Sequence, residues 1–241
     1  MIVVIRPIVD AAAAWTQPLN FGPADQAYVE GLIHEGRAAE ARTARYALMD
    51  ALALRFQRHD LEWVIERGEL GAPSLTLATA PSHLAPASSN AGRRPQAPAI
   101  SLAHTELAAV AATSPARCGV DIEANTRTRI QNAWKRVSTP QEHDWMLSLR
   151  PSRRARYAIL AWTLKESWSK LTGDGLAHRG IELLVEPLDD GSVHVHAPIE
   201  LSAFTTEFGG HTVSLLVEGH HELSSLQGTE AAWIQLVCKR R

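Results

Sequence analysis

The sequence predicts an α+β protein made of two similar α+β subdomains, residues 1–115 and 116–241. Each half contains one long segment without Gly or Pro that carries apolar residues at helical spacing, at 38–56 and at 153–171. Short β-type runs follow both segments. Because each half has the order helix and then strands, we expect a pseudodimer within one chain.

The other predicted elements are short. Strands are expected at 2–5, 61–65, 100–104, 107–112, 118–122, 181–185, 193–196, 201–206 and 212–217, and further helices at 23–34, 127–137 and 140–149. Gly173 stands where a C-cap would end the second long helix. Turn residues at 189–191 and 209–210 predict hairpins. Residues 79–98, rich in Pro, Ser, Ala and Gly, predict a loop, and the tail from Glu218 has no clear pattern.

Composition excludes several classes of protein. The chain has 24 basic and 26 acidic residues, so it lacks the positive excess of a nucleic-acid binder. Its only cysteines, Cys118 and Cys238, form neither a disulfide framework nor a zinc cluster, which fits a reducing compartment. No apolar run approaches the ~20 residues that span a bilayer, and the start lacks a basic signal-peptide region. We therefore expect a cytoplasmic protein without a membrane segment.

The run Gly-Val-Asp-Ile-Glu at 119–123 is the first candidate site. Alternate side chains of a strand share a face, so Asp121 and Glu123 are predicted to point one way, while Val120 and Ile122 enter a core. Two carboxylates at a strand end are oxygen ligands that suit a hard cation. Since Asp-x-Glu is a common pattern, a solvated strand end remains the alternative.

The second long helix carries the next candidates. Glu166 and Lys170 lie four residues apart, beside Trp162, on a face separate from the apolar stripe, and Lys165 is close by. A Glu–Lys pair at this spacing is usually a weak surface salt bridge. The unusual density of charged and aromatic groups on one helix makes a functional site the competing interpretation.

Basic positions outside that helix also stand out. His104 ends a predicted strand, where it could bind phosphate, act as a base or cap a turn. Arg45 continues an apolar helical stripe, so it either reaches water or meets a buried anion. His194 and His196 alternate in a strand, but no third metal ligand is evident, and we expect a structural role for both.

Together these motifs resemble one family, the 4′-phosphopantetheinyl transferases. The resemblance rests on the Gly-Val-Asp-Ile-Glu strand, the later Trp-x-x-Lys-Glu-Ser-x-x-Lys helix at 162–170, and the strand that ends in His104-Thr105. It extends from about Arg42 to about Val217 and is similar to the larger, monomeric, pseudodimeric branch that serves nonribosomal peptide and polyketide synthases. Transfer of 4′-phosphopantetheine from coenzyme A to a serine of an acyl or peptidyl carrier protein, with release of adenosine 3′,5′-bisphosphate, is the activity that it implies.

The resemblance also implies a Mg²⁺ site and catalytic residues. Asp121, Glu123 and Glu166 match the family's metal ligands, which share the ion with the coenzyme A pyrophosphate. Such sharing suits the octahedral oxygen coordination of Mg²⁺. Glu166 is expected to take the serine proton, and Asp121 and Lys170 complete the catalytic set.

Coenzyme A contacts follow from the same matches. Lys170 matches the lysine that faces the pyrophosphate, and Lys165 matches the first lysine of the motif. His104 and Arg45 match positions that contact the 3′-phosphate, a dianion that an Arg fork and an imidazole suit.

Two departures from the family pattern concern the coenzyme. Gly71-Ala72-Pro73 stands where the family often has Gly-Lys-Pro, and Arg93 and Arg94 of the long loop are the expected replacements for that lysine. Ala103 replaces a serine before the histidine.

Two other functions compete with an active transferase. One is a non-catalytic scaffold that binds coenzyme A or a carrier protein. The other is a metal-dependent nuclease, against which the missing basic excess counts. We expect a monomer that meets neither nucleic acid nor membrane and that docks its carrier near the basic residues Arg127, Arg129, Lys135 and Arg136.

Overall fold

The computed structural model describes residues 1–8, 21–57, 63–68, 72–78, 96–127, 129–174, 182–222 and 232–240. Its helices and strands follow the order β1 (Ile2–Pro7), α1 (Pro23–Glu30), α2 (Glu35–Phe56), β2 (Trp63–Arg67), β3 (Pro73–Leu77), β4 (Ala99–His104), β5 (Ala108–Ser114), β6 (Cys118–Ala124), α3 (Arg129–Val137), α4 (Pro140–Ser148), α5 (Pro151–Thr172), β7 (Leu184–Pro187), β8 (Val193–Ala197), β9 (Leu201–Phe208), β10 (His211–Glu218) and β11 (Ile234–Arg240). No described helix is long and apolar enough to cross a membrane.

The described strands form three sheets. The N-terminal sheet has the order β1-β5-β4, the C-terminal sheet the order β6-β10-β9-β11-β8-β7, and β2 pairs with β3. All pairs are antiparallel except β11 with β8. The boundary expected at residues 115/116 falls in the short connection between β5 and β6.

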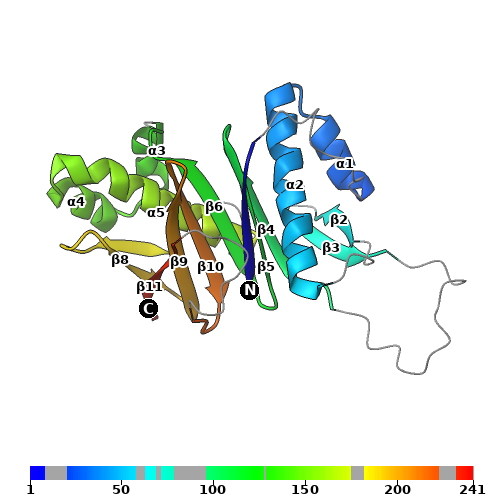
Figure 1. Cartoon of the computed structure of the whole chain (residues 1–241). Coiled ribbons are helices and arrows are strands. Elements are labelled where there is room, and N and C mark those ends of the chain that lie inside the picture. The colour runs from blue at the N-terminus through cyan, green and yellow to red at the C-terminus, as the bar shows by residue number, and fades with distance from the viewer. Residues whose placement is uncertain are drawn as a thin grey trace, which may run out of the picture.

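The two larger sheets pack face to face in the middle of the molecule. Alternate residues of β1, β5, β6 and β10 share one core, which includes Val3, Val110, Val120, Ile122 and Leu215. Figure 1 shows these sheets side by side, with α1 and α2 beyond the N-terminal sheet and α3 and α4 on the opposite side. The mixed helix-and-sheet class predicted from the sequence is therefore confirmed.

Each large sheet has one 22-residue helix packed against it, away from the shared core. On the N-terminal sheet, α2 packs a row of small residues, Ala44, Ala47 and Ala51, that are completely buried. On the C-terminal sheet, α5 packs an apolar stripe into the core of that half, made of Tyr157, Ala161, Leu164 and Trp168. The predicted long helices are confirmed, and Gly173 ends α5 with a left-handed φ of 78°.

The glycine of the Gly-Val-Asp-Ile-Glu run sets the distance between α5 and β6. A Cβ atom on Gly119 would lie 1.8 Å from the backbone oxygen of Ser167. Only a residue without a side chain permits this close approach. Ser167 also donates a 2.9 Å hydrogen bond to the Ser214 backbone oxygen of β10. The glycine therefore brings the backbone of α5 close to β6, the strand that carries Asp121 and Glu123.

The tail and one hairpin differ from the sequence prediction. Residues 234–240, for which no pattern was evident, form β11, which is inserted between β9 and β8. The strand expected at 181–185 begins only at Leu184 and continues to Pro187. Most of the loop expected at 79–98 lies outside the described residues.

Candidate active site

Strand β6 presents its two carboxylates to α5. Asp121 and Glu123 lie on the helix side and are each 6% exposed, while Val120 and Ile122 enter the core between the sheets. The same-face prediction is confirmed, but both acids are buried rather than solvated. A buried carboxylate needs a charge partner or a proton, so the solvated strand end is excluded.

Lys170 of α5 is the main partner of Asp121. Its ammonium donates to Asp121 Oδ1 at 2.7 Å and to the Val120 backbone oxygen at 3.0 Å. Asp121 Oδ2 is buried and has no hydrogen-bond partner. Such an orphaned acceptor is costly.

Glu123 is held from two sides. The Trp162 indole Nε1 donates to Glu123 Oε1 at 3.2 Å, and the half-exposed Arg127 forms an ion pair with Oε2. The aromatic residue that stood beside Glu166 in the sequence thus orients a carboxylate of the neighbouring strand.

All three acids have raised pKa values. Burial, and then the negative charges of Asp121 and Glu123, raise the pKa of Glu166 to about 7, although Lys170 and Arg127 oppose the shift. Burial also raises the pKa of Asp121, and burial together with Asp121 raises that of Glu123. The three carboxylates therefore interact electrostatically and lack sufficient positive charge.

This donor set fits a hard divalent cation. It offers only carboxylate oxygens, one of which, Asp121 Oδ2, has no hydrogen-bond partner, and a nearby cation would lower all three pKa values.

The acids do not converge as tightly as another described group, Glu186, His194 and His196, whose ligand atoms all lie within 4.8 Å of one another. The expectation that the two histidines lack a third metal ligand was therefore wrong.

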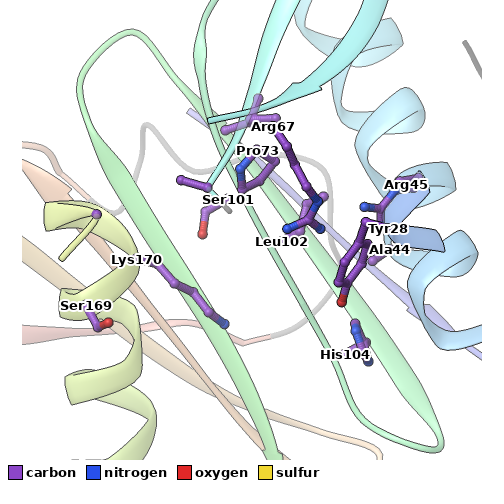
Figure 2. Close-up of a pocket in the computed structure, with 13 residues that line it drawn as sticks. Tyr28, Ala44, Arg45, Arg67, Pro73, Ser101, Leu102, His104, Ser169 and Lys170 are labelled. Atoms are coloured by element: carbon purple, nitrogen blue, oxygen red, sulfur yellow. The ribbon is translucent and has the colours of Figure 1, made fainter. Parts of the chain in front are cut away.

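A cavity of about 320 Å³ has Lys170, the partner of Asp121, in its wall. Its walls come from both halves of the chain: Tyr28, Arg45, Arg67 and His104 from the first half, and Ser169, Lys170 and Gly173 from the second. Figure 2 shows Lys170 reaching from α5 across the space toward the strands, with Arg45, Tyr28 and His104 on the opposite wall. The structure thus brings Arg45, His104 and Lys170, which are far apart in sequence, to one cavity.

The arginine wall is organised by a buried aspartate. Asp25 of α1, fully buried, accepts from Arg45 Nε at 2.7 Å and from Arg67 Nε at 3.0 Å. Arg45 Nη1 also donates to the Ala41 backbone oxygen at 2.8 Å. The Arg67 guanidinium stacks 3.5 Å from the centre of the Tyr28 ring. The buried anion for Arg45, one of the two alternatives left open by the sequence, is thus Asp25.

His104 is tied to a second buried acid. Its Nδ1 lies 2.9 Å from Glu40 Oε2, to which Arg37 also donates at 3.2 Å. Burial lowers the pKa of His104 despite the nearby carboxylate, and Lys170 adds to that lowering. The imidazole is therefore neutral at pH 7 in the absence of an anion, and its orientation is fixed by Glu40.

Lys165 does not reach the cavity. It is completely buried, donates to the Leu183 backbone oxygen at 2.6 Å and lies 2.9 Å from Glu142 Oε1. Glu142 in turn forms the capping box at the start of α4 with Thr139. The structure places Lys165 in a structural ion pair between α5 and α4, which disagrees with the coenzyme contact implied by the resemblance.

Sequence reasoning missed Asp25 and Arg67. Arg67 ends β2 and pairs across the strands with Pro73, the residue next to Ala72. It therefore brings a cation to the place where the Gly-Lys-Pro lysine was absent. Arg93 and Arg94, the replacements that the sequence suggested, lie outside the described residues. The one signal for Arg67 was a basic residue at a strand end, which is too common to be informative.

Comparison with known proteins finds a family match in the C-terminal half of the chain. Residues 117–220 match the family described as the 4′-phosphopantetheinyl transferase superfamily. The matched segment contains β6 and α5, so it includes Asp121, Glu123, Glu166 and Lys170 but neither Arg45 nor His104. No curated protein sequence matches the chain.

Two solved structures match part of the chain. The chain is 18% identical to holo-[acyl-carrier-protein] synthase of Thermotoga maritima, with 44% of this chain and 65% of that chain covered and a TM-score of 0.36. It is 20% identical to a holo-(acyl-carrier-protein) synthase of Bacillus anthracis in complex with CoA (3′,5′-ADP), with 44% and 97% covered and a TM-score of 0.37. The chain thus spans less than two thirds of the length of the Thermotoga protein.

Proposed function

We propose that this chain transfers 4′-phosphopantetheine from coenzyme A to a serine of an acyl or peptidyl carrier protein and releases adenosine 3′,5′-bisphosphate. One observation carries the proposal: a single cavity has arginines and a histidine on one wall and Lys170 on the other, and Lys170 holds Asp121, one of three interacting carboxylates with raised pKa values. A long ligand with phosphates and a divalent cation matches both sides. A cavity between two halves of a chain is also a common place for a cofactor.

Mg²⁺ would be held by Asp121, Glu123 and Glu166 together with the pyrophosphate oxygens. The ion would neutralise the charge that develops on the leaving nucleotide. Its uptake would satisfy Asp121 Oδ2, which now lacks a partner. Arg127 and Lys170, the present cationic partners of Glu123 and Asp121, would then share these carboxylates with the metal.

Glu166 is the proposed proton acceptor for the carrier serine. Its pKa of about 7 before the metal binds shows how strongly its surroundings favour the protonated form. Lys170 lines the cavity and holds Asp121, so its ammonium can orient a pyrophosphate oxygen while it fixes a metal ligand.

The 3′-phosphate of coenzyme A is assigned to the opposite wall. Arg45 uses three of its five N–H donors on Asp25 and Ala41. His104 and Arg67 complete the wall, and Arg67 is the proposed replacement for the lysine of the Gly-Lys-Pro pattern. A phosphate here would raise the pKa of His104 and let the ring donate to it.

The chain is proposed to work as a monomer of the larger, pseudodimeric type. Each half contributes a sheet covered by a 22-residue helix, and both walls of the cavity come from one chain. A cytoplasmic carrier of nonribosomal peptide or polyketide synthesis is the expected substrate.

The test is an incubation with coenzyme A, Mg²⁺ and an apo-carrier protein, read by mass spectrometry of the carrier. A gain of the phosphopantetheinyl mass on the acceptor serine, with adenosine 3′,5′-bisphosphate as product, is expected. Binding of coenzyme A without this gain would favour a non-catalytic scaffold instead.

A further inference from the structure

We propose a second metal site, for Zn²⁺, on the outer face of the C-terminal sheet, with Glu186 of β7 and His194 and His196 of β8 as its protein ligands. This proposal does not depend on the transferase activity. It rests on the only described group of His, Cys, Asp or Glu residues whose ligand atoms all lie within 4.8 Å of one another.

The strand geometry brings the three ligands together. Glu186 and His194 are direct partners in the antiparallel β7–β8 pair, and His196 is two residues further along β8. Residues two apart on a strand share a face, and cross-strand partners have neighbouring side chains. Val193 and Val195 point the other way into the core, so β8 is fixed in this orientation.

The ligand atoms lie about as close together as a tetrahedral ion requires. Glu186 Oε2 lies 2.9 Å from His196 Nε2 and 3.5 Å from His194 Nδ1. Zinc bonds of about 2.1 Å in a tetrahedron place neighbouring ligand atoms about 3.4 Å apart. The two imidazole rings meet edge to face, with an interplanar angle of 79°, so both ring edges can face one point.

The ligand chemistry favours zinc over magnesium. Two imidazoles and one carboxylate form a donor set that suits Zn²⁺, whereas Mg²⁺ prefers oxygen ligands. The three side chains are 22–33% exposed, which leaves the fourth position open to water. Zinc would replace the hydrogen between His196 Nε2 and Glu186 Oε2, and His196 would carry its proton on Nδ1.

Lys239 of β11 competes with the proposed zinc ion for His194. Its ammonium lies 2.8 Å from His194 Nδ1, so that ring nitrogen is an acceptor aimed at the cluster. Lys239 is exposed and can turn away into solvent when the ion binds. Its positive charge weakens zinc binding, and a neutral residue in its place should strengthen it.

Zinc binding would stabilise the edge of the C-terminal sheet. β7 is the edge strand of the C-terminal sheet and is four residues long. An ion shared by Glu186 and His194 would fasten this edge to β8. The site lies on the sheet face opposite to α5, which carries Glu166 and Lys170. Occupancy should therefore stabilise the fold without entering the transfer reaction.

The experiment measures Zn²⁺ affinity of the full chain by competition with a chromogenic chelator, in the presence of excess Mg²⁺. Wild-type protein should bind one zinc ion, and His196→Ala should weaken that binding at least ~10-fold, with near-complete loss in His194→Ala/His196→Ala. Lys239→Ala should bind several-fold more tightly. His34→Ala removes an exposed histidine elsewhere and is the matched control, with unchanged affinity expected.

Asp121→Asn separates this site from the carboxylates of β6. It should keep the zinc affinity of the wild type, and zinc should raise the melting temperature of both proteins but not that of His194→Ala/His196→Ala. Equal zinc affinity in the wild type and the double-histidine variant would overturn the proposal, as would loss of binding in Asp121→Asn alone. None of these readouts uses turnover, so they are independent of the transferase activity.

Discussion

The two walls of the cavity differ in how their buried charged groups are paired. On the N-terminal wall, both guanidiniums pair with an acid, Asp25 for Arg45 and Arg67, and the neutral His104 is hydrogen-bonded to Glu40. On the C-terminal side, Asp121, Glu123 and Glu166 share only Lys170 and Arg127 among the described residues, and one carboxylate oxygen has no partner. The first wall is electrostatically complete, and the second is short of positive charge.

Under the proposed function, this difference separates a side that is preformed from a side that would need a bound cation. Paired guanidiniums hold their positions before a phosphate arrives, so ordering them costs little on binding. Carboxylates that repel one another store free energy that a divalent ion can release. If this contrast is correct, changes on the carboxylate side should reduce activity while they spare or increase stability, and changes on the arginine side should first reduce stability.

The largest effect is expected on the carboxylate side. Glu166→Gln should lower kcat by about 10²-fold or more, because it removes the proposed proton acceptor and a proposed metal ligand together. Its melting temperature without Mg²⁺ should rise, because the substitution removes one of three repelling charges. Mass spectrometry of quenched time points measures kcat, and calorimetry on the same preparation measures the melting temperature. A destabilised Glu166→Gln protein would contradict the contrast.

The arginine side should respond with a loss of stability. Asp25→Ala leaves Arg45, 2% exposed, without its carboxylate, and about 3–5 kcal/mol of unfolding free energy should be lost. Urea unfolding measures this value. The matched control is Asp50→Ala, which breaks the partly exposed pair with Arg6 and should cost about 1 kcal/mol or less. Similar losses in the two variants would show that Asp25 does not organise the wall.

Recognition of the 3′-phosphate should be the next effect in size. Wild type should prefer coenzyme A over 3′-dephospho-coenzyme A. Arg67→Ala or His104→Ala should each lower the ratio of kcat/KM for coenzyme A to kcat/KM for the dephospho form about 10-fold. Arg117→Ala, which removes an exposed arginine paired with Glu218, is the control. An unchanged ratio in both wall variants would assign Arg67 and His104 to structure alone.

The dependence of stability on pH follows from the raised pKa of Glu166. Folding raises this pKa from 4.5 to about 7, so the native state binds the proton more tightly than the unfolded chain. Without metal, the contribution of Glu166 to stability is therefore lost as the pH rises from about 4.5 to about 7. The difference in melting temperature between wild type and Glu166→Gln should grow across this window and shrink again when Mg²⁺ is added. A constant difference would indicate an ordinary surface carboxylate.

The smallest effect is expected for carrier docking. Lys135→Glu/Arg136→Glu reverses two exposed charges on α3 and should raise the KM for an acidic carrier a few-fold at low salt, with the KM for coenzyme A unchanged. Arg127 is less suitable for this test because it also holds Glu123. Equal carrier kinetics in wild type and variant at low salt would place the docking surface elsewhere.

Much of the carboxylate side could be predicted from the sequence, because its geometry is local. Strand alternation placed Asp121 and Glu123 on one face, and helical spacing placed Glu166 with Lys170. Burial was harder to predict: Lys165 precedes Glu166 directly, yet it is fully buried against Glu142. Periodicity indicates the face of a helix but does not identify the partner that the face meets.

The features that sequence reasoning missed depend on long-range pairing. Asp25 meets Arg45 and Arg67 only because α1 folds back onto α2 and β2. The strand expected at 181–185 stopped one residue before Glu186, so the cross-strand partner of His194 was overlooked. Register across a turn decides such contacts, and an error of a few residues at a strand end conceals them.

The most direct test of the account is a Mg²⁺ titration at about pH 7.5, just above the raised pKa of Glu166, in which melting temperature and transfer to an apo-carrier are measured on the same samples of wild type and Glu166→Gln. The account predicts that both quantities rise together in the wild type with one apparent affinity, since the ion that stabilises the carboxylates also supports transfer. Glu166→Gln should show neither response while it remains folded. Full transfer by the wild type in the presence of a chelator, or an equal Mg²⁺ response in the two proteins, would contradict it.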